Sequence, residues 1–83
     1  MKVNVKYFAS IRERIGTGSE QLDTAATTLG ALRDELIARS GAHAESLARG
    51  RAVRMALNQV MSEEGAALSE NCEVAFFPPV TGG

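Results

Sequence analysis

The sequence predicts a small α+β domain in which one main amphipathic helix packs across one face of a mixed β-sheet. Segments near both ends of the chain have the two-residue period of strands, and a segment in the middle has the 3.6-residue period of a helix. The chain has 83 residues, which is the length of a single domain. We therefore expect one domain over residues 1–83, ending in an extended tail over residues 78–83.

The first expected element is a strand over residues 2–7, in which apolar and polar side chains alternate. Its inward-facing residues are Val3, Val5 and Tyr7. A short helix is predicted next, because Ile11 and Ile15 lie four residues apart and so on one side of a helix, and glycines follow it. Residues 19–24 are predicted to form a second strand, joined to the first by this longer connection.

The main helix is predicted over residues 29–40. Its apolar residues recur on one helical face and are Leu29, Leu32, Leu36 and Ile37. Thr27 or Thr28 can cap its first turn, and Gly41 is expected to end it.

Residues 42–49 are predicted to add one or two further helical turns, which bury Leu47 and end at Gly50. His43 lies in this segment among small residues. We expect it to face solvent, and no serine or carboxylate is spaced along the sequence to make it a catalytic base.

The strand period returns after Gly50. The residues expected on one side of this strand are Val53, Met55 and Leu57. Asn58 and Gln59 offer a turn before Val60 and Met61. The last strand is predicted over residues 72–77, and the two prolines after it prevent its continuation.

Three large apolar side chains have the wrong parity for burial under the helix. Phe8 follows the inward-facing Tyr7, Phe77 follows Phe76, and Met61 follows Val60, so each lies on the opposite face of its strand from the residue before it. Exposed apolar side chains that lie together commonly mark a protein interface. We therefore predict that Phe8, Met61 and Phe77 bind a protein partner.

Composition excludes several classes of function. A net charge of −1 argues against a nucleic-acid or anionic-membrane surface. One cysteine, Cys72, and one histidine are too few for a metal site or an internal disulfide, and this composition suits the reducing cytoplasm. The alternating start of the chain lacks the apolar run of a signal peptide or membrane helix. Cys72 has Asn71 and Glu73 as neighbours, which favours a structural role over that of a nucleophile.

The C-terminal sequence PPVTGG is the part of the chain best suited to chemistry. Prolines hold the backbone extended, and glycines without a Cβ let a chain enter a narrow channel with its terminal carboxyl carbon open to attack. A carboxylate has no leaving group, so a partner must activate Gly83, for example by adenylation with ATP. A sulfur nucleophile would then convert the acyl group into a thiocarboxylate. The chain is thus predicted to be a carrier and not an enzyme on its own.

Three segments, FASIRERIG, ALNQ and CEVAFFPPVTGG, resemble the small, sulfur-carrying subunits of molybdopterin synthase, which have a ubiquitin-like β-grasp fold. The resemblance covers nearly the whole chain. The family commonly has Gly-Asp where this chain has Asn71 and Cys72. Asn tolerates a left-handed turn, so we expect the fold to persist.

The resemblance implies a mechanism and a set of partners. An adenylyltransferase related to ubiquitin-activating enzymes would use ATP to form an acyl-adenylate on Gly83, and a sulfur donor protein would supply the thiocarboxylate. The tail, with Thr81 and Gly82, would then enter the large synthase subunit and transfer sulfur to cyclic pyranopterin monophosphate. It also implies a heterotetramer with that subunit, contacted through the apolar residues identified above, and no bound cofactor.

Three other functions remain open from the sequence. A sulfur carrier for thiamine thiazole synthesis would have the same tail chemistry with a different acceptor. A ubiquitin-like modifier would join its C-terminus to lysines of other proteins. A plain interaction domain would have a tail without a function.

Overall fold

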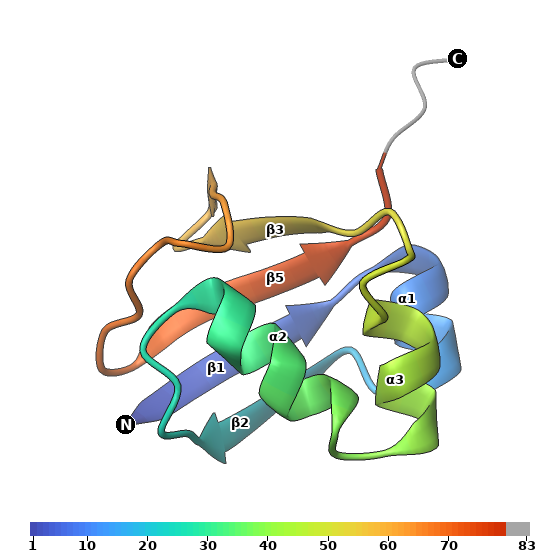
Figure 1. The fold of residues 1–83 in the computed structure, drawn as a ribbon, viewed down its shortest axis with the longest axis horizontal. Coiled ribbons are helices and arrows are strands. Elements are labelled where there is room, and N and C mark those ends of the chain that lie inside the picture. Colours follow the sequence, from blue (N-terminus) through green and yellow to red (C-terminus); the bar gives the residue numbers. More distant parts are fainter. Residues whose placement is uncertain (80–83) are drawn as a thin grey trace.

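The computed structural model describes residues 1–79 and shows a five-stranded mixed sheet with the strand order β2-β1-β5-β3-β4. The strands are β1 (Lys2–Tyr7), β2 (Ser19–Asp23), β3 (Arg54–Leu57), β4 (Val60–Met61) and β5 (Cys72–Phe77). β1 and β5 are parallel, and the other neighbouring strands are antiparallel. The first and last strands of the chain therefore lie side by side in the centre of the sheet (Figure 1).

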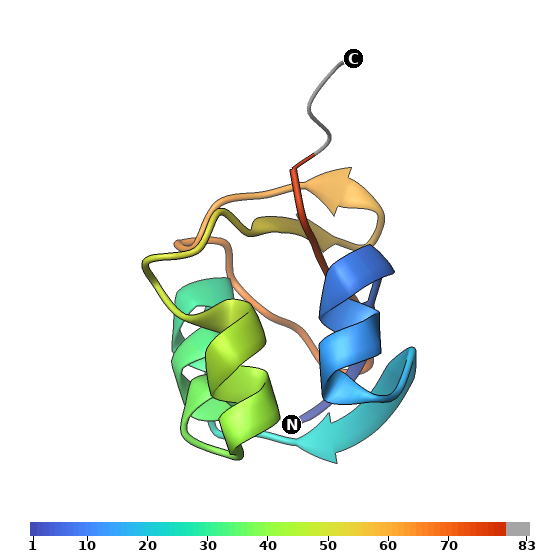
Figure 2. The ribbon, with the colours of Figure 1, turned by 90° about the vertical axis from the view of Figure 1, so that its right-hand side faces the viewer.

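The described helices are α1 (Ala9–Ile15), α2 (Leu29–Ile37) and α3 (Gly41–Leu47). α2 crosses one face of the sheet as the predicted main helix, and α3 packs beside it (Figures 1 and 2). α1 lies at the end of the sheet where β1 and β5 finish, and it contacts α3. Within residues 1–79 no helix packs on the opposite face of the sheet, which we call the uncovered face. None of these helices is long and apolar enough to cross a membrane.

The core forms between the helices and the face of the sheet that the alternation predicted. Val3, Val5 and Tyr7 are buried as expected. The residues opposite them in the register of β5 are Cys72, Val74 and Phe76, which are buried too. The helices contribute Leu29, Leu32, Leu36 and Leu47, none of which is exposed. Each such side chain contributes about 1.5–3 kcal/mol through burial.

The predicted helix over residues 29–40 is wrong at its end. α2 stops at Ile37, and Gly41 is the first residue of α3 instead of a helix terminator. The cause is Ser40, whose extended backbone (φ −159°) breaks the helical path and whose Oγ accepts a hydrogen bond from the His43 N–H as the cap of α3. α3 in turn ends before Gly50, at Leu47. Thr28 is the cap of α2, accepting from the Ala31 N–H at 3.2 Å.

Residues with positive φ shape two of the turns. Asn58 and Gln59, at φ 50° and 68°, connect β3 to β4 as a two-residue hairpin loop, which confirms the predicted turn. Asn71, at φ 61°, confirms the left-handed turn expected before β5. Val53, expected within the strand, lies just before β3 and is half-buried. Val60 and Met61, of opposite parity, are both exposed, because β4 is the edge strand.

Candidate functional site

The residues predicted to carry sulfur, Thr81, Gly82 and Gly83, lie outside the described residues. Of the predicted tail, only Pro78 and Pro79 are described, and they follow β5 out of the sheet (Figure 1). The part of the candidate site that the structure shows is therefore the surface around the point where the chain leaves the sheet.

Apolar side chains gather on the uncovered face near this point. Phe8 and Met61 are 46% and 56% exposed, as predicted, although Met61 owes its exposure also to the edge position of β4. Phe77 is half-buried, because it lies in a central strand between two neighbours. The three side chains thus stand outside the core.

Strand register brings these residues together. Tyr7 is opposite Phe76 in the parallel β1–β5 pair, and Phe8 keeps an extended backbone and donates its N–H to the Phe76 carbonyl at 3.2 Å. Phe8 therefore lies beside Phe77 on the uncovered face. The next residue, Ala9, has φ 52° and turns the chain sharply into α1.

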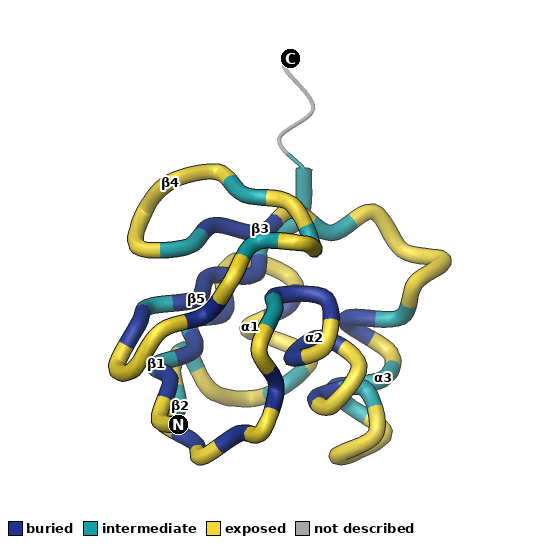
Figure 3. The backbone as a smooth tube through the Cα atoms, turned by 60° about the vertical axis from the view of Figure 1, so that its left-hand side comes forward, coloured by how far each residue is buried: buried dark blue, intermediate teal, exposed yellow. Residues whose placement is uncertain are grey.

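Two alanines, each only 8% exposed, lie between these side chains on the same side of the sheet. Ala75 is opposite Ala56, and Ala56 is opposite Met61, so the three residues form a row across β5, β3 and β4. In Figure 3, β4 is exposed, whereas most of β5 is buried. We call this surface the apolar patch; it consists of Phe8, Ala56, Met61, Ala75 and Phe77.

The rest of the uncovered face is polar. Gln21 donates a hydrogen bond from its Nε2 to Asn4 Oδ1 at 3.2 Å, and Lys6 pairs with Glu73 at 3.3 Å. The apolar patch is consequently bordered by polar side chains, and Lys6 lies directly beside its Ala75.

A buried polar cluster, which the sequence analysis missed, attaches α3 to the sheet. His43 is buried and not solvent-facing as expected: its Nε2 lies 3.0 Å from Glu20 Oε2 and its Nδ1 lies 2.7 Å from Ser40 Oγ. Tyr7 donates its hydroxyl to the same Glu20 oxygen at 2.7 Å, and Arg39 pairs with the other oxygen at 3.3 Å. These residues are remote in sequence, so spacing could not predict their contacts. The sequence did indicate that Glu20 faces the core, because Glu20 and the buried Leu22 lie two residues apart in one strand.

These contacts shift two pKa values in opposite directions. Burial raises the pKa of the Tyr7 phenol, and the bond to Glu20 adds to this shift, so the phenol stays neutral. Burial alone would raise the pKa of Glu20, but hydrogen bonds from His43 and Tyr7 and the charge of Arg39 outweigh it and lower that pKa. Each polar group has a partner within the fold, so the cluster holds the end of β1 in place immediately before Phe8.

Replacing Glu20 with Gln is expected to destabilise the fold at pH 7 by about 1 kcal/mol, a modest loss because the carboxylate is partly exposed. Since folding lowers the pKa of Glu20, its stabilisation is present above the ordinary value of 4.5 and is lost as the pH falls through the folded-state pKa. The difference between wild type and Glu20→Gln should therefore shrink on acidification from pH 7 to 3, as measured by denaturant unfolding. Glu45→Gln, an exposed change on α3, should show no such pH dependence; a gap that stays constant would contradict the assignment.

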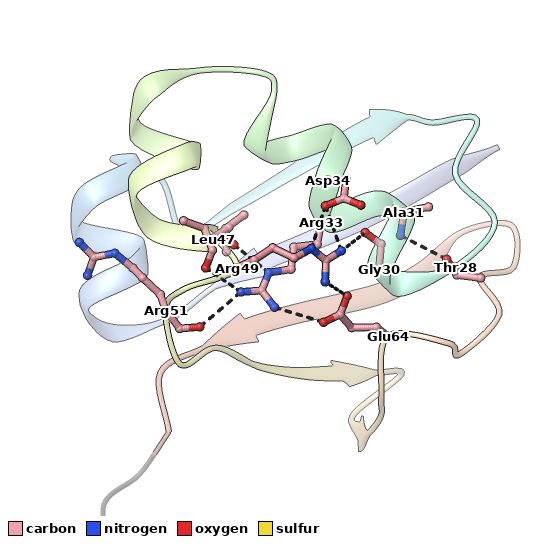
Figure 4. Close-up of polar contacts among 10 residues, drawn as sticks. Thr28, Gly30, Ala31, Arg33, Asp34, Leu47, Arg49, Arg51 and Glu64 are labelled. Atoms are coloured by element: carbon pink, nitrogen blue, oxygen red, sulfur yellow. Dashed lines mark hydrogen bonds and ion pairs between the residues drawn. The ribbon is translucent and has the colours of Figure 1, made fainter.

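A second polar cluster fixes the loop before β3 (Figure 4). Arg33 is 5% exposed and donates from Nε to the Leu47 carbonyl at 2.7 Å and from Nη2 to the Ala48 and Arg51 carbonyls at 2.9 and 3.4 Å. Its Nη1 lies 3.5 Å from a Glu64 oxygen. Burial lowers the pKa of Arg33 and Glu64 opposes this effect, but a guanidinium remains charged at neutral pH.

Arg49 joins the same cluster from the loop itself. It pairs with Asp34 and Glu64 and donates to the Gly30 carbonyl at 3.2 Å. Gly30 permits this close packing, because a Cβ there would lie 2.9 Å from Glu64 Oε1. The cluster thus connects α2, residues 48–53 and the loop after β4, and it sets where β3 begins.

Arg33→Met is expected to lower the free energy of unfolding by about 2–3 kcal/mol, because it leaves buried carbonyls without their charged donor. Denaturant unfolding measures this loss. Arg51→Met is the matched control, since the side chain of Arg51 is exposed and points away from the cluster (Figure 4), and it should change stability by less than about 0.5 kcal/mol. Equal effects of the two changes would show that the carbonyl contacts do not stabilise the loop.

The described residues contain no group of three or more His, Cys, Asp or Glu side chains that could hold a metal ion. Cys72 is a free thiol, 3% exposed in the core, in agreement with a structural role. The arrangement within residues 1–79 is that of a binding surface beside the exit of the C-terminal segment.

A mixed sheet of this order with a main helix across one face defines a ubiquitin-like β-grasp protein, and the solved structures similar to it have the same fold. The chain belongs to the ThiS family, whose model matches residues 5–83.

Relatives and solved structures make the similarity more specific. The molybdopterin synthase sulfur carrier subunit of Haemophilus influenzae is 38% identical over 81 residues, which cover 98% of this chain and 99% of that protein. A chain in a complex of subunits 1 and 2 of the molybdopterin-converting factor from Helicobacter pylori is 25% identical with a TM-score of 0.70, and all of both chains is covered. The small archaeal modifier protein 1 of Haloferax volcanii is 26% identical with a TM-score of 0.76, covering 95% of this chain and 98% of that one.

Proposed function

We propose that this chain is the sulfur-carrier subunit of a molybdopterin synthase and carries sulfur as a thiocarboxylate on Gly83. The observation that carries this proposal is 38% identity, over nearly the full length of both chains, to a protein of that name. The family match extends to the terminal glycine. The apolar patch beside the exit of the tail supports the proposal, because a carrier must bind its partner through the folded domain while its C-terminus reaches the partner's active site.

The chemistry belongs to the C-terminus and to the partners. An adenylyltransferase joins the Gly83 carboxylate to AMP and releases pyrophosphate from ATP, which gives the acyl carbon a leaving group. A sulfur nucleophile, delivered by a donor protein, then displaces AMP and leaves the thiocarboxylate. The chain binds no cofactor in this scheme, and the reaction changes only its last residue.

The large synthase subunit is the proposed acceptor partner. The Helicobacter pylori structure named above is a complex of two such subunits. We place the contact on the apolar patch and the acceptor pterin, cyclic pyranopterin monophosphate, at the end of the tail. Two carriers and two large subunits would form a heterotetramer in the cytoplasm, where the free thiol of Cys72 stays reduced.

Intact-mass spectrometry tests this proposal. The chain is incubated with the adenylyltransferase, ATP and a sulfide source, and the expected product has one sulfur in place of one oxygen. Adding the large subunit and the pterin should return the original mass and form the dithiolene. The chain without the adenylyltransferase is the control and should remain unchanged; failure to gain sulfur in the complete mixture would refute the carrier function.

A second candidate, a protein modifier, is favoured by the similarity to the small archaeal modifier protein 1. Such a modifier would form isopeptide bonds to lysines. Mass spectrometry of the protein recovered from cells distinguishes the two, because conjugation gives ladders of higher mass and sulfur carriage gives none. Complementation of a strain lacking the synthase small subunit separates this function from sulfur carriage to thiamine thiazole.

A further inference from the structure

Arg54 is a cation placed among the apolar residues of the uncovered face. It is the first residue of β3, and its partner in the register of the antiparallel β3–β5 pair is Phe77. Directly opposed residues on neighbouring strands have Cβ atoms about 4.5–5.5 Å apart. Arg54 also shares its parity with Ala56, which is opposite Met61. Its exposed side chain therefore stands between the Phe77 and Met61 parts of the apolar patch.

Within residues 1–79, Arg54 makes no side-chain hydrogen bond and no ion pair, as is also true of Arg51, whereas three other cations have carboxylate partners. Lys6, on the same face, pairs with Glu73. Arg33 and Arg49 both pair with Glu64.

Two glutamates line the same hollow as Arg54. Arg54 lines an open hollow of about 480 Å³ together with Met61, Glu63 and Glu64. Glu64 is already held by the arginine cluster, and Glu63 is exposed and forms no ion pair in the described part of the chain. Within residues 1–79, the guanidinium thus has no protein group to accept its hydrogen bonds.

A partner that covers the apolar patch removes water from this guanidinium. Burying an unpaired charge is costly, whereas a guanidinium that meets a carboxylate forms two parallel, charge-assisted hydrogen bonds. A partner with an apolar surface alone would bind poorly here, and one with a cation at this point would be repelled. An unpaired guanidinium at this position would therefore discriminate among partners that fit the patch equally well in shape.

We propose that Arg54 is a specificity-determining residue for the large synthase subunit, and that this subunit presents an Asp or Glu carboxylate to Arg54 beside its contact with Phe77. The proposal rests on the proposed function, because it takes the large subunit as the occupant of the patch. We choose a partner that bears a carboxylate because an unpaired guanidinium within an apolar surface requires an opposite charge when it is covered.

Titration calorimetry of the full-length carrier with the large subunit from the same organism tests the proposal. Arg54→Glu is expected to weaken binding by at least about a hundredfold, because it places two carboxylates together in a desolvated contact. Arg54→Met keeps the length and apolar character of the side chain and should weaken binding by about tenfold, since the partner carboxylate loses its donor. Wild-type affinity should fall with added salt more steeply than that of Arg54→Met.

Arg51→Glu is the matched control. It makes the same change of net charge in the loop before β3, at an exposed side chain, and should alter binding by less than about threefold. Circular dichroism and thermal unfolding show whether the variants fold alike. Equal binding by wild type and Arg54→Glu, or equal losses in Arg54→Glu and Arg51→Glu, would overturn the role of Arg54. Absence of binding by the wild type would instead refute the large subunit as partner.

Discussion

Deletion of Gly83 is expected to abolish molybdopterin formation while the free energy of unfolding stays within about 0.5 kcal/mol of the wild-type value. The proposed reaction takes place at the terminal carboxyl carbon, so a chain that ends one residue early presents that carbon out of reach of both partners. Stability should be unaffected, because the buried core within residues 1–79 includes no residue after Phe76. Thiocarboxylate yield by intact mass and dithiolene formation with the large subunit measure the first effect, and denaturant unfolding measures the second.

Two further changes at this end control for position and shape. One residue added after Gly83 should be as damaging as the deletion, since the carboxylate of Gly83 then becomes the carbonyl of a peptide bond and cannot be adenylated. Gly82→Ala should cause an intermediate loss, because a methyl group restricts the backbone next to the reacting carbonyl. Full cofactor synthesis by the chain lacking Gly83 would show that the C-terminus is not the sulfur carrier.

Phe77→Ala is expected to weaken large-subunit binding by about 2 kcal/mol or more, which is typical of an aromatic anchor at an interface. Its cost to folding should be smaller, about 1–2 kcal/mol, because Phe77 is half-buried on the uncovered face. Titration calorimetry and denaturant unfolding measure the two effects on the same protein.

Phe76→Ala is the matched comparison, one residue earlier in the same strand. Phe76 is completely buried between the sheet and the helices, so its loss should cost about 3–5 kcal/mol of stability. If Phe77→Ala had the larger unfolding penalty, or left binding unchanged, Phe77 would belong to the core and not to the interface.

Local patterns in the sequence were enough to predict most elements. The alternation around Val5 and Val74 identifies the strands that lie side by side at the centre of the sheet, because a strand with one buried face has a period of two whatever it pairs with. The turn at Asn58 and Gln59 was predictable for a similar reason, since its positive φ angles depend on the residues in the turn. The exposure of Phe8 follows from its parity alone.

Errors and omissions arose where the outcome depends on distant parts of the chain. Gly41 is compatible with both the end and the start of a helix, and the cap provided by Ser40 decides between them. His43 is buried because Glu20 and Tyr7, far away in sequence, meet it at the end of β1. No spacing rule brings such partners together.

The sequence alone thus determined the class of the fold, the strand faces and the glycine pair at the C-terminus, because each depends on neighbouring residues or on composition. The tertiary structure decided which of the outward-facing residues form one surface. Phe8 and Phe77 become neighbours only through the parallel pairing of β1 with β5, and Arg54 joins them only through the register of β3. Pairing between remote strands is set by the path of the whole chain and the burial of the common core, and no local pattern contains that information.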